Sequence, residues 1–377
     1  MDRRPSHCIA RAAGVTVLAL TAVARGMAQQ PGRAVFTVGT ASASRGSVAT
    51  GAIAVPAGSD SAIDIQVAVI HGAHPGPVVA FIAGTHATEY STIIAMQRLI
   101  PRIDPARLSG TVIIVPVVNV PSFTSMTPIR NPVDGKTTVA GYPGDSTGTQ
   151  SQRVMALLTT QVVAQADVLV DFHGGDLDED VGAPFSAVVR GGREKPDAEG
   201  MRLALAYGFN HILITDRDAA SPRVGGSLAG QGLIRGEAVI LVAAGRSGVV
   251  APADLDGVVN GSLNMLAALK MISRPVSART LHPVFLDGAG PRIAAQQSGV
   301  WFPTVKANAM VHKGDQLGYT TDFLGKRTGA VLSPNDGLVV YVHGVPSMRR
   351  GVVLAEVLPV LAAVPPWQAP ASRPRGD

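Results

Sequence analysis

Two short segments of the sequence carry side chains that could bind a metal ion. His86 and Glu89 form an H-x-x-E pair directly after the apolar run PVVAFIAG, and His173 directly follows a second apolar run, DVLVDF. Two histidines and a glutamate are a known ligand set of catalytic zinc, which keeps a further position open for water. Such a metal makes that water nucleophilic near neutral pH and polarises a bound carbonyl group. The pattern therefore predicts Zn2+ held by His86, Glu89 and His173.

Each half of this set has a second interpretation when it is taken alone. An H-x-x-E pair arises often by chance, and a histidine at the end of a strand more commonly makes a polar contact than binds a metal. The metal prediction depends on both halves following strands of the same kind, each beside small residues that open space: Gly84 before His86, and Gly174 after His173.

The segments around these residues alternate between apolar runs of strand length and stretches with helical spacing. The expected strands are 77–84, 111–118, 167–172, 210–215 and 237–244, and the expected helices are 91–100, 150–163 and 258–272. Alternation of this kind predicts a mixed or largely parallel sheet covered by helices on both faces. Open α/β sheets bind ligands at the carboxyl ends of their strands, where both metal-type segments lie.

The composition changes near residue 275. From His282 onward, short strands are separated by Gly, Pro, Asn and Asp turns such as HKGDQLG and SPNDGL, which predicts a small all-β domain. We therefore expect a catalytic domain over 29–278, a C-terminal β domain over 279–364 and a disordered, proline-rich tail over 365–377.

The first 28 residues have the order of a secretory signal peptide. Arg3, Arg4 and Arg11 precede the apolar run AAGVTVLALTAVA, and small residues end this segment at Ala28. We expect cleavage near Ala28 and a secreted or periplasmic protein with no stable membrane span after cleavage. Cys8, the only cysteine, lies in this segment, so the mature chain would have neither disulfides nor thiolate ligands.

The charge of the chain excludes one class of partner. The formal net charge is +5, of which the signal segment contributes +3 through Asp2, Arg3, Arg4, Arg11 and Arg25, so +2 remains. No basic stripe interleaved with aromatic residues accompanies it, and we expect no nucleic-acid binding. The expected partner is a small-molecule substrate, and no feature of the sequence specifies an oligomeric state.

Several motifs together resemble the succinylglutamate desuccinylase/aspartoacylase family, a branch of the zinc carboxypeptidase group. They are GTHATEY before a helix, GTVIIVPVVN, R-x-P-x-DG, YPG and ADVLVDFHGG, in this order over roughly residues 65 to 250. HGGD followed by acidic residues is similar to a bacterial secreted branch. The resemblance implies a zinc-carboxypeptidase-like fold with a C-terminal β domain, zinc at the three residues above, and hydrolysis of non-peptide amide bonds.

The same resemblance suggests residues around the metal. Asn119 and Arg130 match polar positions near the family's substrate pocket, and Arg130 could hold a carboxylate in a fork; a surface arginine is the alternative. Asp171 points to the same face of its strand as His173 and could orient it, or pair with a cation instead. The acidic residues from Asp176 to Asp180 are interpreted as a solvated loop or a rim facing the substrate.

The sequence departs from the family pattern at two functional positions. The family's L-N-R segment, whose asparagine and arginine bind substrate, is replaced by Thr138-Val139-Ala140, and the general-base glutamate is replaced by Ala243. General acid–base catalysis contributes about 10² to 10⁴ in rate. Glu179 is the weak candidate to replace that glutamate, because Glu237 precedes a buried strand and is expected at its far end.

The resulting prediction is a zinc-dependent hydrolase of amide bonds in small N-acyl amino compounds. The alternative is a catalytically impaired pseudoenzyme, or a metal- or ligand-binding protein, on the same scaffold. The one G-x-S-x-G match, Gly144 to Gly148, does not follow an apolar run of strand length as a nucleophile elbow would, which argues against a serine hydrolase.

Overall fold

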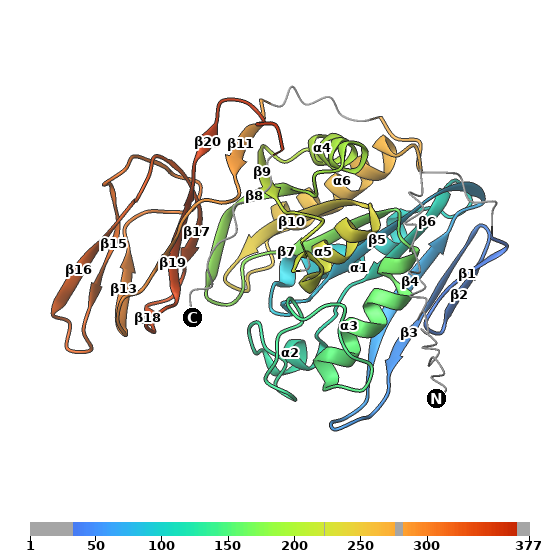
Figure 1. The fold of residues 1–377 in the computed structure, drawn as a ribbon, viewed down its shortest axis with the longest axis horizontal. Coiled ribbons are helices and arrows are strands. Elements are labelled where there is room, and N and C mark those ends of the chain that lie inside the picture. The colour runs from blue at the N-terminus through green and yellow to red at the C-terminus, as the bar shows by residue number, and fades with distance from the viewer. Residues whose placement is uncertain (1–32, 222, 276–281, 368–377) are drawn as a thin grey trace, which may run out of the picture.

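The protein is described here by a computed structural model that covers residues 33–221, 223–275 and 282–367. The predicted signal peptide (1–28) and most of the predicted tail (368–377) lie outside the described residues. The predicted architecture is confirmed: a large mixed sheet carries helices on both faces, and an all-β region follows at the C-terminal end (Figure 1).

The main sheet is built around parallel strands that carry the predicted metal ligands. In the order β8-β10-β7-β5-β6-β4-β3, the pairs β10/β7, β7/β5 and β5/β6 are parallel, whereas β8/β10 and β4/β6 are antiparallel. The strands are β3 (Ser47–Val55), β4 (Ile63–His71), β5 (His74–Ala83), β6 (Ser109–Val115), β7 (Val168–His173), β8 (Glu179–Arg190), β9 (His211–Asp216) and β10 (Ala238–Arg246).

Two apolar layers cover the two faces of this sheet, because its central strands are apolar on both sides. On one face, α1 (Tyr90–Leu99), α4 (Glu194–Tyr207) and α6 (Pro252–Ala268) pack against Phe81 and Phe172. On the other face, α3 (Gln150–Gln161), α5 (Leu228–Arg235) and the hairpin of β1 (Val35–Val38) and β2 (Ala41–Ser44) pack against Leu169 and Val239. The short helix α2 (Val120–Ser125) follows β6.

The helix ends follow local chemistry. α3 begins with a capping box in which the side chains of Thr149 and Gln152 satisfy exposed backbone N–H groups. α6 starts at Pro252, six residues before the predicted 258, since proline fits the first turn of a helix. It ends at Ala268 rather than 272, because Lys270 adopts a left-handed conformation (φ +58°). Short 3-10 turns cover Ile100–Arg102, Val163–Gln165 and Val224–Gly226.

The C-terminal region contains only strands among its described residues, as predicted. Strands β16, β15, β13 and β18 form a separate four-stranded sheet around the buried Trp301, while β17 pairs with β8 and β11 pairs with β9 of the main sheet. These strands are β11 (Val284–Asp287), β12 (Arg292–Ala294), β13 (Gly299–Pro303), β14 (Met310–Val311), β15 (Gln316–Thr321), β16 (Arg327–Leu332), β17 (Gly337–His343), β18 (Ser347–Met348), β19 (Val353–Leu358) and β20 (Val360–Leu361).

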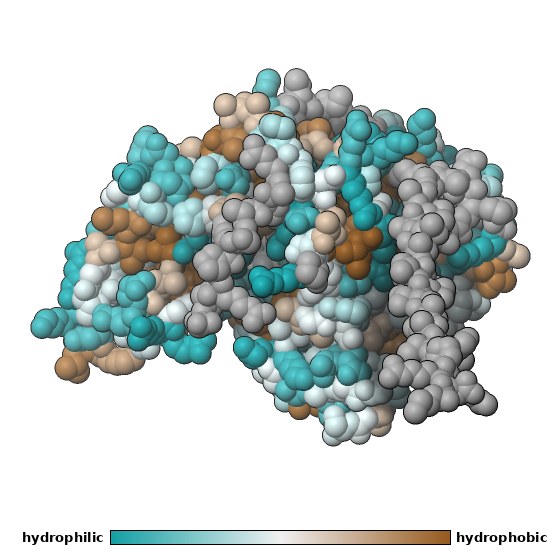
Figure 2. All heavy atoms as spheres, in the orientation of Figure 1, coloured by the Kyte–Doolittle hydropathy of each residue, from teal (hydrophilic) through white to brown (hydrophobic). Residues whose placement is uncertain are grey.

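The surface is mixed in polarity. Figure 2 shows apolar residues gathered over the C-terminal β region (left) and hydrophilic residues over much of the rest of this face. No helix among the described residues is both long enough and apolar enough to cross a membrane.

Candidate functional site

The structure brings His86, Glu89 and His173 together at one end of the parallel strands. One potential ligand atom from each residue lies within 4.8 Å of those of the other two. Glu89 stands between the imidazoles: its Oε1 is 2.8 Å from His86 Nδ1, and its Oε2 is 3.2 Å from His173 Nδ1.

The turn between β5 and α1 presents the first two of these residues. Gly84 ends the strand with φ +69°, and a Cβ atom there would lie 2.8 Å from the Cα of Val117, so only glycine fits. Residues His86 to Glu89 then form the entry to α1, which begins at Tyr90. Ala87, between His86 and Thr88, does not have a positive φ, so it is accommodated without backbone strain.

His173 comes from the end of β7, the parallel neighbour of β5. Parallel strands place their carboxyl ends at the same edge of the sheet, which is why His173 meets Glu89 there although the two are 84 positions apart in the sequence. The next residue, Gly174, packs so closely on β10 that a Cβ atom would lie 2.4 Å from the carbonyl oxygen of Ala244. Glycine is therefore required at this position, because any side chain would collide with β10.

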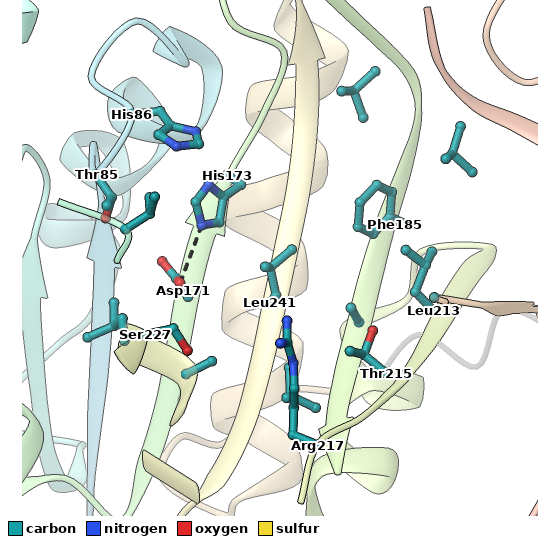
Figure 3. Close-up of a pocket in the computed structure, with 18 of the residues that line it drawn as sticks. Thr85, His86, Asp171, His173, Phe185, Leu213, Thr215, Arg217, Ser227 and Leu241 are labelled. Carbon is teal, nitrogen blue, oxygen red and sulfur yellow. Dashed lines mark ion pairs between the residues drawn. The ribbon is translucent and has the colours of Figure 1, made fainter. Parts of the chain in front are cut away.

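The charges of this cluster depend on one another. Burial raises the pKa of Glu89, but the adjacent His173 and His86 more than offset this and hold it below its usual value. Burial lowers the pKa of His173, yet Asp171 and Glu89 raise it well above its usual value. The carboxylate of Asp171 lies 3.3 Å from His173 Nε2, on the side of the ring away from Glu89 (Figure 3).

The three donors fit the requirements of zinc. Glu89 Oε2 is buried, and although it lies 3.2 Å from His173 Nδ1, it makes no hydrogen bond of good geometry among the described residues. Both histidines direct Nδ1 at the same carboxylate, and the other ring nitrogen of His173 faces Asp171, which is how outer carboxylates orient metal-binding imidazoles.

The loop after His173 differs from the predicted solvated loop. Asp176 is completely buried, and its carboxylate accepts a hydrogen bond from the hydroxyl of Thr88, inside the turn that carries His86 and Glu89. Burial raises the pKa of Asp176 to about 6. This contact joins the two ligand-bearing segments and could not be inferred from an acidic run in the sequence.

Glu179 lies at the start of β8 and points back into the same loop. Its Oε2 accepts a hydrogen bond from the backbone N–H of Asp176 at 3.3 Å. Burial, together with the charges of Glu89 and Asp176, raises its pKa to about 7. Glu179 is not among the residues that line the cavity described next.

A cavity of about 490 Å³ opens beside the candidate metal ligands. At one end it is lined by Thr85, His86, Asp171 and His173, and from there it extends along the sheet over β10, β8 and β9 (Figure 3). Its middle is apolar, and strands of the C-terminal region close its other side. The residues of the middle and the far wall are Phe185, Leu213, Leu241, Val340, Tyr341, Arg292 and Glu356.

Ala243 occupies the position beside His173 on the neighbouring strand. It pairs with His173 of β7 on one side and with Phe185 of β8 on the other. Because side chains alternate along a strand, Ala243 points to the same face as Leu241, which lines the cavity. At the position beside the candidate metal ligands where the family pattern has a glutamate, the side chain is therefore only a methyl group.

The two predicted substrate-binding residues do not reach this cavity. Arg130 is exposed and donates a hydrogen bond to the carbonyl oxygen of Gly135 at 2.9 Å, within its own turn. Asn119 is buried, where its side chain caps α2 by accepting a hydrogen bond from the N–H of Ser122. Its backbone N–H donates a hydrogen bond to the carbonyl oxygen of Gly84, so Asn119 stabilises the turn that carries His86.

Sequence reasoning missed most of the cavity wall. Thr215 lies in β9, Arg217 directly follows that strand, and Ser227 is the N-cap of α5. The C-terminal strands contribute Arg292, Tyr341 and Glu356. None belongs to a motif. The pairing of β8 with β9 brings Thr215 and Arg217 to the site, and the pairing of β8 with β17 brings the residues of the C-terminal strands. Ser227 accepts a hydrogen bond from the N–H of Gly230 and so caps α5.

Comparison with known proteins identifies a family that matches the central part of the chain. Residues 75–269 match the succinylglutamate desuccinylase/aspartoacylase catalytic domain family. The chain is 25% identical over 297 residues to the N-α-acetyl-L-2,4-diaminobutyric acid deacetylase of Halomonas elongata, a match that covers 77% of this chain and 84% of that protein.

Solved structures share the fold. A succinylglutamate desuccinylase/aspartoacylase from Rhodobacter sphaeroides has a TM-score of 0.74 at 24% identity, over 84% of this chain and 96% of that one. The product-bound ectoine utilization protein EutE (DoeB) from Ruegeria pomeroyi has a TM-score of 0.75 at 19% identity, over 83% of this chain and 95% of that one.

Proposed function

Because this chain belongs to the succinylglutamate desuccinylase/aspartoacylase family, we propose that it is a zinc-dependent deacylase of small N-acyl amino compounds. Relatives are deacylases, such as the N-α-acetyl-L-2,4-diaminobutyric acid deacetylase of Halomonas elongata. The observation that carries the proposal is the convergence of His86, Glu89 and His173 at the end of a cavity large enough for a small molecule.

In this proposal, the three ligands bind the metal and their neighbours hold the ligands in place. Zinc in this set would supply an activated water and polarise the carbonyl of the scissile amide. Asp171 holds His173 in the orientation that directs Nδ1 toward Glu89. The bond between Thr88 and Asp176 keeps the two ligand-bearing segments in register.

The cavity itself would bind and orient the substrate. Its apolar walls, Phe185, Leu213 and Leu241, would exclude water from the part of the substrate next to the scissile bond. No carboxylate stands in the slot of Ala243 to move a proton between the attacking water and the leaving amine. We therefore expect turnover to be slow: Glu179, whose pKa is raised to about 7, does not line the cavity and would have to leave its hydrogen bond to the N–H of Asp176 to act as the base.

The methyl group of Ala243 also favours a second candidate function. A site that keeps its metal ligands and its cavity but lacks the acid–base group suits a binding protein that retains a small N-acyl compound without hydrolysing it. This alternative differs from the first only in turnover, because both require the same three ligands.

The test measures metal and turnover on the same preparation. We expect about one zinc ion per chain and release of acetate from N-acetyl-L-2,4-diaminobutyrate or another N-acetyl amino acid. His86→Ala should lose both, while His312→Ala, at an exposed position outside the cavity, should lose neither. Turnover that survives His86→Ala would refute the zinc mechanism; full zinc and ligand binding without turnover would favour the binding protein.

The location of the reaction follows from the N-terminal segment. We propose that the protein is exported and loses residues 1–28, as the charged, apolar and small-residue order of that segment indicates. Sequencing of the N-terminus of the protein recovered from a periplasmic fraction tests this, and a chain that keeps Met1 in the cytoplasm would contradict it.

A further inference from the structure

The turn between β15 and β16 exposes two large apolar side chains that are adjacent in the sequence. Phe323 is 78% exposed and Leu324 is 96% exposed, the two highest values among the large apolar residues that the structure describes. β16 forms the edge of the C-terminal region farthest from the main sheet, so this hairpin lies at one end of the molecule (Figure 1). Because large apolar side chains gain free energy when they leave water, the pair is suited to an apolar partner outside the chain.

Hydrogen bonds within the turn hold the pair in place. One carboxylate oxygen of Asp322 accepts hydrogen bonds from the backbone N–H groups of Leu324 and Lys326, each at 2.9 Å. The N–H of Asp322 donates to the carbonyl oxygen of Lys326, and Gly325 supplies the positive φ (+85°) that closes the turn. Asp322 is the only acidic residue over 316–335, and this carboxylate is used inside the turn.

Cations lie behind the apolar pair. Lys326 and Arg327 are exposed at the start of β16, and the exposed Arg349 lines the same shallow groove as Phe323. The guanidinium of Arg327 lies over the ring of Tyr319, 4.9 Å from its centroid, which fixes one cation at the base of the turn. These three cations form no ion pair with a carboxylate in the part of the chain that the structure describes.

The size and charge of this tip favour a lipid surface over a second copy of the chain. A symmetric dimer through the tip would place its cations against the same cations of the partner. Two side chains also present far less than the roughly 800 Å² per partner that a stable protein interface buries. An anionic bilayer requires less: apolar side chains that reach below the headgroups, and cations at the level of the lipid phosphates.

From this arrangement we propose that the turn between β15 and β16 is a contact site for anionic membrane surfaces. Phe323 and Leu324 enter the outer hydrocarbon of the bilayer, while Lys326, Arg327 and Arg349 bind lipid phosphates. Binding through so small a tip is weak and reversible, and it weakens as salt screens the cations. The contact is independent of the proposed deacylase activity, so tip variants should hydrolyse a soluble substrate at the unmodified rate.

Flotation of the full chain with lipid vesicles tests the contact. Vesicles of phosphatidylcholine alone are compared with vesicles that contain equal parts of phosphatidylcholine and phosphatidylglycerol. Phe323→Ser combined with Leu324→Ser should lower the affinity for the anionic vesicles at least about 10-fold. Lys326→Gln combined with Arg349→Gln should lower it about 25-fold, at about fivefold per cation.

A matched control removes two exposed valines at the other end of the molecule. Val35→Ser combined with Val48→Ser, in β1 and β3, should leave the affinity for anionic vesicles unchanged. Residues 1–28 are common to all of these chains, so any binding through that segment cancels when the variants are compared.

A nitroxide label reports whether the tip itself enters the lipid. In a Cys8→Ser chain, which has no other cysteine, a label on Leu324→Cys should become more accessible to oxygen and less accessible to a water-soluble nickel complex when anionic vesicles are added. A label on Val48→Cys should not change. A label at position 324 that stays in water while the protein is bound, or equal affinity of the serine pair and the unmodified chain, would overturn the proposal. Dimerisation that the serine pair abolishes, without vesicle binding, would assign the tip to a second copy instead and equally overturn it.

Discussion

Replacing Ala243 by glutamate should increase turnover, because the structure leaves a place for a general base beside the metal ligands. Ala243 is only 3% exposed, is level with His173 on the adjacent strand, and lies on the same face of β10 as Leu241, which lines the cavity. A glutamate there would extend from β10 across the end of the cavity that contains His86. Ala243 is the last residue of β10 in regular register with β8, because the register shifts between Ala243 and Gly245.

The expected gain follows from the role of the new carboxylate. General acid–base catalysis contributes about 10² to 10⁴ in rate, and each factor of ten corresponds to about 1.4 kcal/mol of barrier. The nearby carboxylates of Glu89 and Asp171 and the buried position would raise the pKa of the new group toward neutrality, which suits a base that must also return the proton. The same burial should cost about 1 to 3 kcal/mol of unfolding free energy.

The assay compares kcat/KM for N-acetyl-L-2,4-diaminobutyrate in the unmodified protein, Ala243→Glu and Ala243→Gln, each with its zinc content measured. Glutamine has the size of glutamate but cannot take a proton, so it isolates the effect of the base. We expect at least a 100-fold advantage of Ala243→Glu over Ala243→Gln. Equal rates in two folded, zinc-loaded variants would refute the assignment of this slot to proton transfer.

Three further predictions concern stability. Burial raises the pKa of Glu237 to about 8, so the folded protein keeps a proton that the unfolded chain loses above its usual pKa of 4.5; stability should fall by on the order of 4 kcal/mol between pH 5 and 8, and Glu237→Gln should flatten this slope in thermal melts. Arg153→Ala should cost about 3 kcal/mol in urea unfolding, because the buried guanidinium bonds Asp60 and the carbonyl of Pro56, whereas Arg107→Ala should change little; an equal effect of the two would contradict this. Removal of zinc by a chelator should lower Tm by an amount equivalent to about 4 kcal/mol if free zinc had been a thousandfold above its Kd, and His86→Ala should show no such shift.

Much of the fold could be predicted from the sequence, because local patterns of apolar residues specify it. The central strands of the main sheet are buried on both faces and read as continuous apolar runs, such as the segment around Phe172. Helical spacing located α1 and α3 to within one or two residues. The start of α6 was misplaced by six residues because the signal there is Pro252 at the first turn rather than a change in apolar spacing.

The candidate ligands could also be located from the sequence, for a topological reason. Parallel strands end at the same edge of a sheet, so a histidine after one strand and an H-x-x-E pair after another must lie near each other. The absence of a glutamate at Ala243 could be predicted for the same reason, because this residue lies at the end of a third parallel strand, β10. Motif and register together were sufficient for these four positions.

The substrate side of the site was decided only by the tertiary structure. Arg217, Tyr341 and Glu356 share a cavity because β9 and the C-terminal strands happen to pair around β8, and no local pattern encodes which edges of a sheet meet. The burial of Asp176 against Thr88, 88 residues away, likewise arises from packing of two loops. The sequence by itself thus determined where the three candidate metal ligands meet, because that depends on strand ends. Which residues line the cavity beside them depends on long-range packing, which only the folded chain displays.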